Sequence, residues 1–571
     1  MKKVSSVLLV VLFGAVFWLG DRVTEGVRHG TAGKSGQALL KVLPDVAGMV
    51  ASRIKADPLT LSTARPDLIG GVVAAVLLFL IVMYAVTSKV TRRPGEEQGS
   101  AAWATPRDIA PLTTKDRTKR LQLTATESLA IDTRKTQRNL NVLVVGGAGT
   151  RKTRGYVMPN LAQVDMSSAI TDPKGEIQRE IGPTLESRGY DVRTFNLIDL
   201  QHSHHFNAFK YFDEENPETS VMQLAECIMT NTSGTEGNKG DAFWDRAERA
   251  LLTALIAYVW ATVADQDDRE ASLVDVVDLQ KQMAASEEAA DSFESTVDQQ
   301  MAAARELVAE WRDQAEVSDP QEELVMNVLD FATRQYRTFE QGAGETKKSI
   351  IISLGVRLAP LDMNAVRRII ADDNLDLDEL GQKPMALFLA IPDTHQTFRF
   401  LATIFWTTLY SHNIYLADHS ETGHLPRPVH TFLDEFANIG KIPGFPQLVA
   451  TMRSRGLSTS IIIQSNAQGK ELWKEAWPGV VGNCDTLLYL GGRDFETHKW
   501  ISEQLGDQTV VTQETSKTYG VNNSQSRSNH IIKRSLMTPD EVGRMSNELA
   551  ILIVRGLRPF KSRKAQLHAP K

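Results

Sequence analysis

The sequence of 571 residues predicts an α/β protein with a parallel sheet, an inserted all-α domain and an N-terminal two-helix transmembrane anchor. Three observations predict this class. Short β-branched runs alternate with helix-compatible stretches, a long region has helical periodicity without strand-like runs, and two uncharged apolar runs lie near the N-terminus. With 42% hydrophobic residues and only two cysteines, the composition excludes a mainly disordered chain and a disulfide scaffold.

The two apolar runs predict a membrane anchor over residues 1–93. Residues 4–20 and 68–88 carry no charge, and each run is long enough to span a bilayer. Basic residues in 89–93 favour a cytoplasmic end for the second run. A cleaved signal peptide is the alternative for the first run, and both readings place the following chain on the cytoplasmic side. We therefore expect a multi-pass protein of the cell membrane with a cytoplasmic main body.

After the anchor, the pattern predicts a linker and an interrupted α/β domain. Residues 94–140 are polar, contain three prolines and predict the linker. The α/β domain is expected in two parts, 141–215 and 346–571, the second ending in a C-terminal tail. Helical periodicity predicts an all-α domain over 216–345. The predicted buried parallel strands are 141–145, 168–171, 192–197, 385–391, 429–433, 460–464, 486–490 and 550–554. A segment rich in Thr, Ser and Asn, 508–535, predicts a loop or hairpin.

Charge is unevenly distributed along the chain. Residues 265–323 contain 18 acidic and four basic residues, a net charge of −14, whereas the whole chain carries −7. The remainder therefore carries +7, and the two parts are expected to face different partners. A solvated acidic helical face is the alternative reading of this segment.

The turn after the first predicted strand has the residues of a phosphate-binding loop, which are Gly146, Gly147, Gly149, Lys152 and Thr153. Glycines let backbone N–H groups surround phosphates, the lysine can reach the terminal phosphates, and the hydroxyl can bind magnesium. Arg151 stands where the pattern has glycine, which costs about 1 kcal/mol if the position needs a positive φ. The alternative is an ordinary glycine-rich turn.

Further candidate residues follow two later strands. Asp434 and Glu435 end the run 429–433, where the first carboxylate can hold magnesium and the second can orient or deprotonate a water. Arg453 could project from one subunit onto a neighbour's nucleotide, and Gln464, at the end of the next strand, could sense a terminal phosphate. Taken singly, an acidic strand end and a surface arginine are also common structural features.

Together these motifs resemble the type IV secretion system coupling proteins, the TraG/TraD-type ATPases of conjugative DNA transfer. The matching stretches are 144–154, 158–160, 171–176, 432–440, 464–468 and 483–485. The two apolar runs, the helical insert and residues 554–560 also look like the Gram-positive branch of this family. The similarity covers nearly the whole chain.

The resemblance implies a RecA-like P-loop ATPase core that binds ATP and Mg²⁺ in a two-part nucleotide-binding domain. It assigns nucleotide binding to Gly146, Gly147, Gly149, Arg151, Lys152 and Thr153, magnesium to Thr153 and Asp434, and catalysis to Glu435, Arg453 and Gln464.

The resemblance also implies a homo-hexamer at the cytoplasmic (inner) membrane. Such a ring recruits relaxase-bound single-stranded DNA and delivers it to the channel proteins of a type IV secretion system. Two alternatives stay open. One is a substrate receptor that does not hydrolyse ATP, with a site degraded at Arg151. The other is a chromosome-segregation DNA translocase, which residues 172–176 and the inserted domain disfavour.

Overall fold

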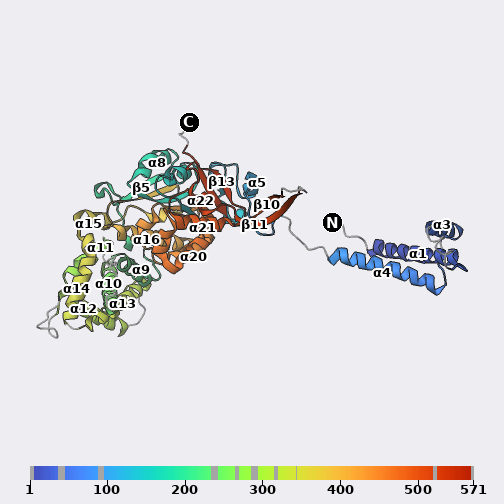
Figure 1. Cartoon of the computed structure of the whole chain (residues 1–571). Coiled ribbons are helices and arrows are strands. Elements are labelled where there is room, and N and C mark those ends of the chain that lie inside the picture. Colours follow the sequence, from blue (N-terminus) through green and yellow to red (C-terminus); the bar gives the residue numbers. More distant parts are fainter. Residues whose placement is uncertain are drawn as a thin grey trace. The chain divides into compact units, whose positions relative to one another are not determined.

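A computed structural model describes residues 6–35, 45–58, 60–87, 95–232, 242–263, 269–284, 294–313, 319–342, 344–518 and 524–567. The chain divides into two compact units, Met1–Glu97 and Gln98–Lys571 (Figure 1). Each unit has its own packing and is described by itself.

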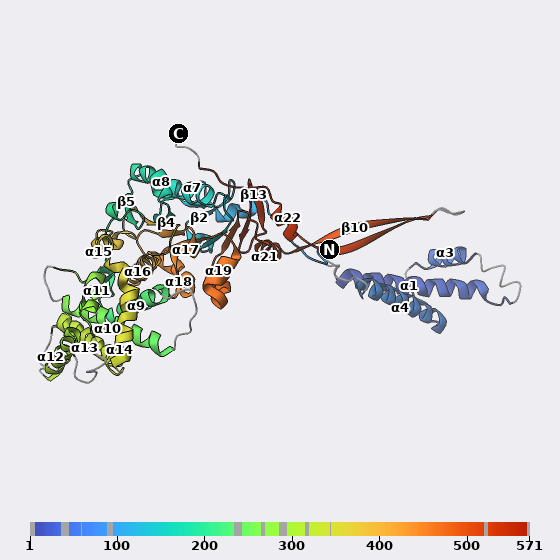
Figure 2. The ribbon, with the colours of Figure 1, turned by 60° about the vertical axis from the view of Figure 1, so that its left-hand side comes forward.

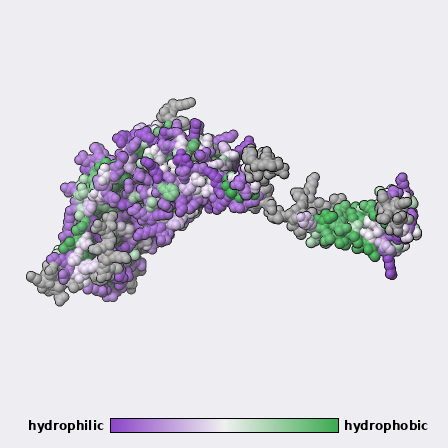
Figure 3. Space-filling view, viewed as in Figure 1, coloured by the Kyte–Doolittle hydropathy of each residue, from purple (hydrophilic) through white to green (hydrophobic). Residues whose placement is uncertain are grey.

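The N-terminal unit consists of helices α1 (Ser6–Thr31), α3 (Val46–Ala56) and α4 (Arg65–Thr87). Small residues let α1 and α4 approach closely, since a Cβ atom on Gly20 would lie 2.6 Å from the Cβ of Ala74. Exposed apolar side chains cover α4, and Figure 3 shows them gathered over this unit.

The described part of the chain contains one unbroken helix that is a candidate membrane span. Among the described residues, Arg65–Tyr84 is the helical segment that is long and apolar enough to cross a membrane. The predicted second span, 68–88, largely coincides with it. The predicted first span, 4–20, begins outside the described residues, and α1 continues beyond it through Asp21 and Arg22, which are buried. The prediction of a multi-pass protein is therefore not supported.

The larger unit contains a nine-stranded sheet in the order β13-β12-β9-β3-β8-β7-β4-β6-β5. Its strands are β3 (Val142–Val145), β4 (Ser167–Pro173), β5 (Asp191–Asn196), β6 (Met385–Ile391), β7 (Val429–Leu433), β8 (Leu457–Ile463), β9 (Thr486–Tyr489), β12 (Leu549–Val554) and β13 (Phe560–Arg563). All eight predicted strands are present. From β9 to β5 the neighbours are parallel, which confirms the α/β class.

One strand direction was predicted wrongly. β12 runs antiparallel to β9 and also pairs antiparallel with β13, so the sheet has an antiparallel edge. An apolar run indicates that a strand is buried but carries no information about its direction.

Alternate residues of each strand face opposite sides of the sheet, and each side has its own apolar core. Val142 and Val144 belong to one core, whereas Leu143 and Val145 belong to the other. The first core includes residues of α7 (Met158–Gln163) and α8 (Glu176–Ser187). The second core includes α16 (Arg399–Asp418) and the helical insert, visible apart from α7 and α8 in Figure 2.

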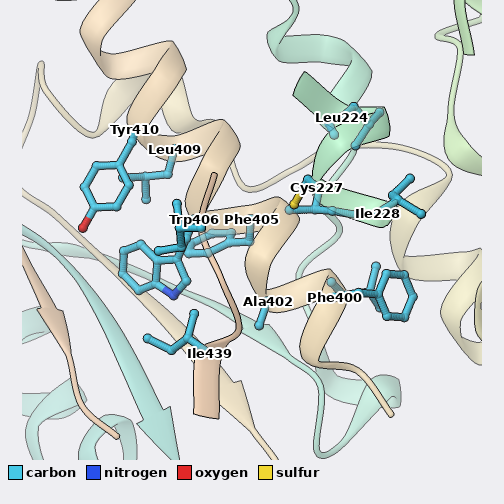
Figure 4. Packing of buried hydrophobic residues seen from close by; sticks show 14 of the residues in the cluster. Leu224, Cys227, Ile228, Phe400, Ala402, Phe405, Trp406, Leu409, Tyr410 and Ile439 are labelled. Atoms are coloured by element: carbon cyan, nitrogen blue, oxygen red, sulfur yellow. The ribbon is translucent and has the colours of Figure 1, made fainter. Parts of the chain in front are cut away.

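The helical insert lies between β5 and β6 in the chain. It comprises α9 (Pro217–Thr232), α10 (Ala242–Val263), α11 (Leu273–Lys281), α12 (Thr296–Asp313), α13 (Pro320–Glu340), α14 (Gly344–Leu358) and α15 (Asn364–Ile370). The predicted boundary at 345 falls inside α14, because the helical pattern continues to Ile370. Figure 4 shows how the insert joins the sheet domain, with Leu224, Cys227 and Ile228 of α9 close to side chains of α16.

The segment predicted as a linker, 94–140, is mostly part of the folded core. It contains α5 (Pro106–Ile109), β1 (Arg120–Gln122), β2 (Ser128–Ala130) and α6 (Thr133–Thr136). Leu121, Leu123 and Leu129 are buried in the core beside α7, so apolar contacts with distant residues outweigh the polar local composition.

The remaining elements lie in the C-terminal half. The predicted loop or hairpin at 508–535 is a hairpin of β10 (Asp507–Thr518) and β11 (Ser524–Ser535). The helices are α17 (Phe436–Ile439), α18 (Phe445–Thr451), α19 (Asn466–Trp473), α20 (Trp477–Gly482), α21 (Phe495–Leu505) and α22 (Pro539–Gly543).

Candidate nucleotide-binding site

Three adjacent parallel strands bring the predicted site residues to one edge of the sheet. β3 pairs with β8, and β8 pairs with β7. The glycine-rich loop follows β3, Asp434 and Glu435 follow β7, and Gln464 follows β8. The carboxyl ends of parallel strands form the usual ligand-binding edge of an open α/β sheet.

The loop after β3 is fixed by hydrogen bonds to both neighbouring strands. The N–H of Gly146 donates to the carbonyl of Ile463 at 3.0 Å, and the N–H of Gly147 donates to that of Gly491 at 2.9 Å. A Cβ atom on Gly146 would lie 2.5 Å from the hydroxyl oxygen of Thr150, so a larger residue here would displace the Thr150 side chain. Gly149 has a φ of 73°, in the left-handed region. The predicted loop residues therefore form a close backbone turn.

Lys152 is folded onto this turn. Its Nζ donates to the carbonyl of Gly146 at 2.8 Å and to that of Gly147 at 3.2 Å. The residue is buried. An ammonium group in this place can exchange loop carbonyls for phosphate oxygens without leaving the turn.

The next residue links the loop to the acidic pair. The hydroxyl of Thr153 donates to Oδ2 of Asp434 at 2.6 Å. Burial raises the pKa of Asp434 to about 6, with a smaller contribution from the charge of Glu435, while the Thr153 hydrogen bond opposes the rise. A buried carboxylate beside a hydroxyl is an oxygen donor set that suits Mg²⁺, and a cation there would offset the cost of the buried charge.

Glu435 is held in a specific position by its backbone and by Gln464. Its φ is 53°, and its N–H donates to Oδ1 of Asp434 at 3.1 Å. Nε2 of Gln464 donates to Oε2 of Glu435 at 3.0 Å. The N–H of Gln464 in turn donates to Oε1 of Gln468 at 2.8 Å. The end of β8 therefore orients the carboxylate at the end of β7.

Arg151 adopts a positive φ at the position where the phosphate-loop pattern has glycine. Its φ is 67°, and its guanidinium forms an ion pair with Glu548 at 3.0 Å. The side chain is thus directed toward the segment before β12. The loop accepts arginine at this position at the cost of a left-handed backbone conformation.

Arg453 lies away from the other candidates within one chain. It belongs to the short 3₁₀ helix Met452–Arg455, and its Nη2 donates to the carbonyl of Thr133 at 2.8 Å. In the described part of the chain, no hydrogen bond or ion pair joins Arg453 to the loop or to the acidic pair. A role at a nucleotide would therefore require a neighbouring subunit.

Sequence reasoning missed Glu548 and Lys564, which contact the loop from the C-terminal region. Lys564 is buried, and its Nζ donates to the carbonyl of Thr150 and to Oδ1 of Asn547, both at 2.9 Å. The pKa of Lys564 is lowered to about 8, chiefly by burial and to a smaller extent by the charge of Arg151, while the charge of Glu548 opposes the shift. No local motif marks either residue, because each acts through a contact about 400 residues away in sequence.

These features give the turn after β3 the geometry of a phosphate-binding loop on a mostly parallel α/β sheet, consistent with a RecA-like core. Residues 102–569 match the family described as type IV secretory system conjugative DNA transfer, and the chain belongs to this family. It is therefore related to the type IV coupling proteins.

Relatives of known name agree with this assignment. The conjugal transfer protein TraG of Rhizobium radiobacter is 22% identical over 441 residues, covering 74% of this chain and 61% of TraG. Protein VirD4 of the same organism is 25% identical over 145 residues, covering 24% of this chain and 20% of VirD4. The chain thus spans about six tenths of the length of the TraG relatives.

Solved structures show the same fold. The conjugative coupling protein TrwBdeltaN70 in its unbound form has a TM-score of 0.55 at 15% identity, covering 82% of this chain and 93% of that chain. TrwB in complex with ADP and Mg²⁺ has a TM-score of 0.54 at 13% identity, covering 82% of this chain and 94% of that chain.

Proposed function

We propose that this protein is a membrane-anchored, ATP-driven coupling protein that recruits relaxase-bound single-stranded DNA and delivers it to a type IV secretion channel. The observation that carries the proposal is the joining of the phosphate loop to the acidic pair. Thr153 contacts Asp434, and Gln464 contacts Glu435, at one edge of the sheet. A loop that only closes a turn has no need of either contact.

Each residue of this edge has a role in the proposed reaction. Lys152 binds the terminal phosphates of ATP after leaving the carbonyls of Gly146 and Gly147. The hydroxyl of Thr153 and the carboxylate of Asp434 hold Mg²⁺. Bound Mg²⁺ supplies charge neutralisation for the phosphates. Gly149 and Arg151 shape the backbone around the phosphates.

Glu435 is the proposed catalytic carboxylate. It orients the attacking water and accepts its proton, while Gln464 fixes the direction of the carboxylate through a 3.0 Å hydrogen bond. Gln464 is also suited to sense the terminal phosphate, because its side-chain amide could contact both that phosphate and the Glu435 carboxylate. Such a contact would link the presence of ATP to the position of the catalytic carboxylate.

Arg453 is proposed to act on the nucleotide of a neighbouring subunit in a homo-hexamer. Its present contact with the Thr133 carbonyl leaves it outside its own site. Donation of a positive charge across a subunit interface stabilises the charge that develops in phosphoryl transfer. This role predicts that Arg453→Ala lowers turnover in the assembled ring while each subunit still binds nucleotide.

The acidic segment 265–323 is proposed to contact a basic protein partner, such as the relaxase that carries the DNA. The segment has a net charge of −14, which suits a basic partner. The rest of the chain carries +7, and this positive part suits a DNA-facing surface. Charge reversal across this segment is expected to weaken relaxase binding and to leave ATP binding unchanged. Unchanged relaxase binding would remove this part of the proposal.

A second candidate function is a receptor at the channel that binds nucleotide without hydrolysing it. The left-handed Arg151 favours this reading, because it departs from the glycine of the family motif. The hydrogen bond that orients Glu435 favours hydrolysis, since a binding-only site does not need an oriented carboxylate. Steady-state ATP hydrolysis by wild type and Arg151→Gly separates the two: turnover restored only by glycine would support the receptor.

A further inference from the structure

A cavity lies beside the phosphate loop, between the helix that follows the loop and the C-terminal segment. Its volume is about 730 Å³, within the range of small-molecule sites. Its lining comprises Arg117, Arg120, Gln122, Ala125, Pro159, Gln163, Ser546, Glu548, Leu549, Arg563, Lys564, Ala565 and Gln566. None of the residues assigned to phosphate, magnesium or catalysis lines it.

Two residues of the cavity wall contact the phosphate loop. Lys564 donates to the carbonyl of Thr150 at 2.9 Å, and Glu548 pairs with Arg151 at 3.0 Å. A Cβ atom on Gly155 would lie 3.3 Å from the carbonyl oxygen of Ala565, so the C-terminal segment crosses closely over the first turn after the loop. The cavity therefore adjoins the phosphate loop.

The wall contains two buried donors that lack acceptors. Nε of Arg120 and Nε2 of Gln163 are buried and have no hydrogen-bond partner in the described part of the chain. Buried polar groups are almost always paired, and an unpaired one carries a desolvation cost. Acceptor atoms of a ligand would satisfy both groups.

The charge of the cavity wall favours a ligand that carries negative charge. The wall carries the cationic side chains of Arg117, Arg120, Arg563 and Lys564, against one acid, Glu548, which is already paired with Arg151. An acceptor-rich ligand that brings negative charge fits this wall. A nucleotide has ring-nitrogen and hydroxyl acceptors at one end and phosphates at the other, and arginine guanidinium planes stack on base faces.

We propose that this cavity receives the base and ribose of the nucleotide whose phosphates occupy the loop, with Gln163 donating to an acceptor of the base. The inference rests on the proposed function, since it takes the loop as the phosphate site. Gln163 is then a specificity residue outside the phosphate-binding motif.

Binding of two probes to the full-length chain in detergent tests this assignment. ADPNP carries base, ribose and phosphates, whereas inorganic tripolyphosphate carries the phosphates alone. Gln163→Leu removes the unpaired donor, and Ala125→Trp fills the cavity from an exposed position. Gln382→Leu, at an exposed glutamine outside the cavity, is the matched control.

Gln163→Leu is expected to weaken ADPNP binding about 3- to 10-fold, the range of one hydrogen bond, and Ala125→Trp at least as much. Neither change should alter tripolyphosphate binding, and Gln382→Leu should alter neither probe. Without nucleotide, Gln163→Leu should melt at the same temperature as wild type or higher, because it removes a buried unpaired group.

Two results would overturn the assignment. Unchanged ADPNP affinity in both cavity variants would place the nucleoside elsewhere, and equal weakening of both probes would show that the cavity holds an anion or acts on the loop indirectly. Failure of the proposed function is a separate outcome. In that case wild type binds neither probe, or Lys152→Ala binds both as tightly as wild type.

Discussion

The hydroxyl of Thr153 donates a 2.6 Å hydrogen bond to the carboxylate of Asp434 across 281 residues of sequence. This contact joins the turn after β3 to the end of β7 and places a buried carboxylate next to the phosphate loop. Asp434 is 2% exposed, and its pKa is raised to about 6, chiefly by burial. Its position therefore costs stability that a bound cation can offset.

Asp434→Asn is expected to stabilise the protein without Mg²⁺ at neutral and alkaline pH. The folded pKa of about 6 lies above the ordinary 3.8, so the folded state binds the proton more tightly, and stability falls as pH rises between these values. The difference corresponds to about 3 kcal/mol above pH 6. Thermal unfolding of wild type and variant from pH 4 to pH 8 checks this.

The same variant should lose its response to magnesium. Mg²⁺ with ADPNP should raise the melting temperature of wild type and leave that of Asp434→Asn close to its value with ADPNP alone. A variant that is less stable than wild type at pH 8 in the absence of Mg²⁺ would contradict the account of the buried charge.

Arg151→Gly is expected to be more stable than Arg151→Ala by about 1 kcal/mol. Both variants lose the contact with Glu548, but glycine adopts the φ of 67° without strain whereas alanine keeps the strain. The ion pair itself contributes little, because its side chains are 43% and 54% exposed. Chemical denaturation of both variants measures the difference.

Glu548→Ala is the control for the ion pair, and it should shift stability by less than about 1 kcal/mol. If Arg151→Ala were as stable as Arg151→Gly, the loop would not keep its left-handed conformation at this position.

Gln464→Ala is expected to lower kcat for ATP hydrolysis about 10-fold or more and to leave KM nearly unchanged. Gln464 orients Glu435, and in the described part of the chain it forms no hydrogen bond with the phosphate loop, so binding of the phosphates by the loop should persist. Steady-state kinetics over a range of ATP concentrations separates the two constants. Gln382→Ala is the matched control, and a rise in KM at constant kcat would assign Gln464 to binding instead.

Much of the fold could be predicted from local sequence. The runs that became β3, β6 and β7 are short and apolar, and each forms a fully buried strand of the sheet. The phosphate loop and the acidic pair were found because each is a contiguous motif. The structure then placed the loop, Asp434, Glu435 and Gln464 at one edge, as parallel pairing requires.

The features that sequence reasoning missed depend on contacts between distant segments. The direction of β12 is set by its pairing with β9 and β13, and the predicted linker folds because Leu121 and Leu129 meet the core beside α7. Nothing in the sequence indicated that the Arg151 side chain pairs with Glu548, because the two residues lie far apart in the chain. A second membrane span is not supported: among the described residues, length and hydropathy select Arg65–Tyr84, whereas α1 continues through the charged residues Asp21 and Arg22.

The central claim is that the edge holding Lys152, Asp434 and Glu435 hydrolyses ATP to drive DNA transfer. The most direct test is steady-state ATP hydrolysis by the full-length chain, with and without single-stranded DNA, in wild type, Glu435→Gln and Lys152→Ala. The account predicts DNA-stimulated turnover in wild type, none in either variant, and ATP binding retained in Glu435→Gln. Turnover in Glu435→Gln at the wild-type rate, or no turnover in wild type under any condition, would contradict it.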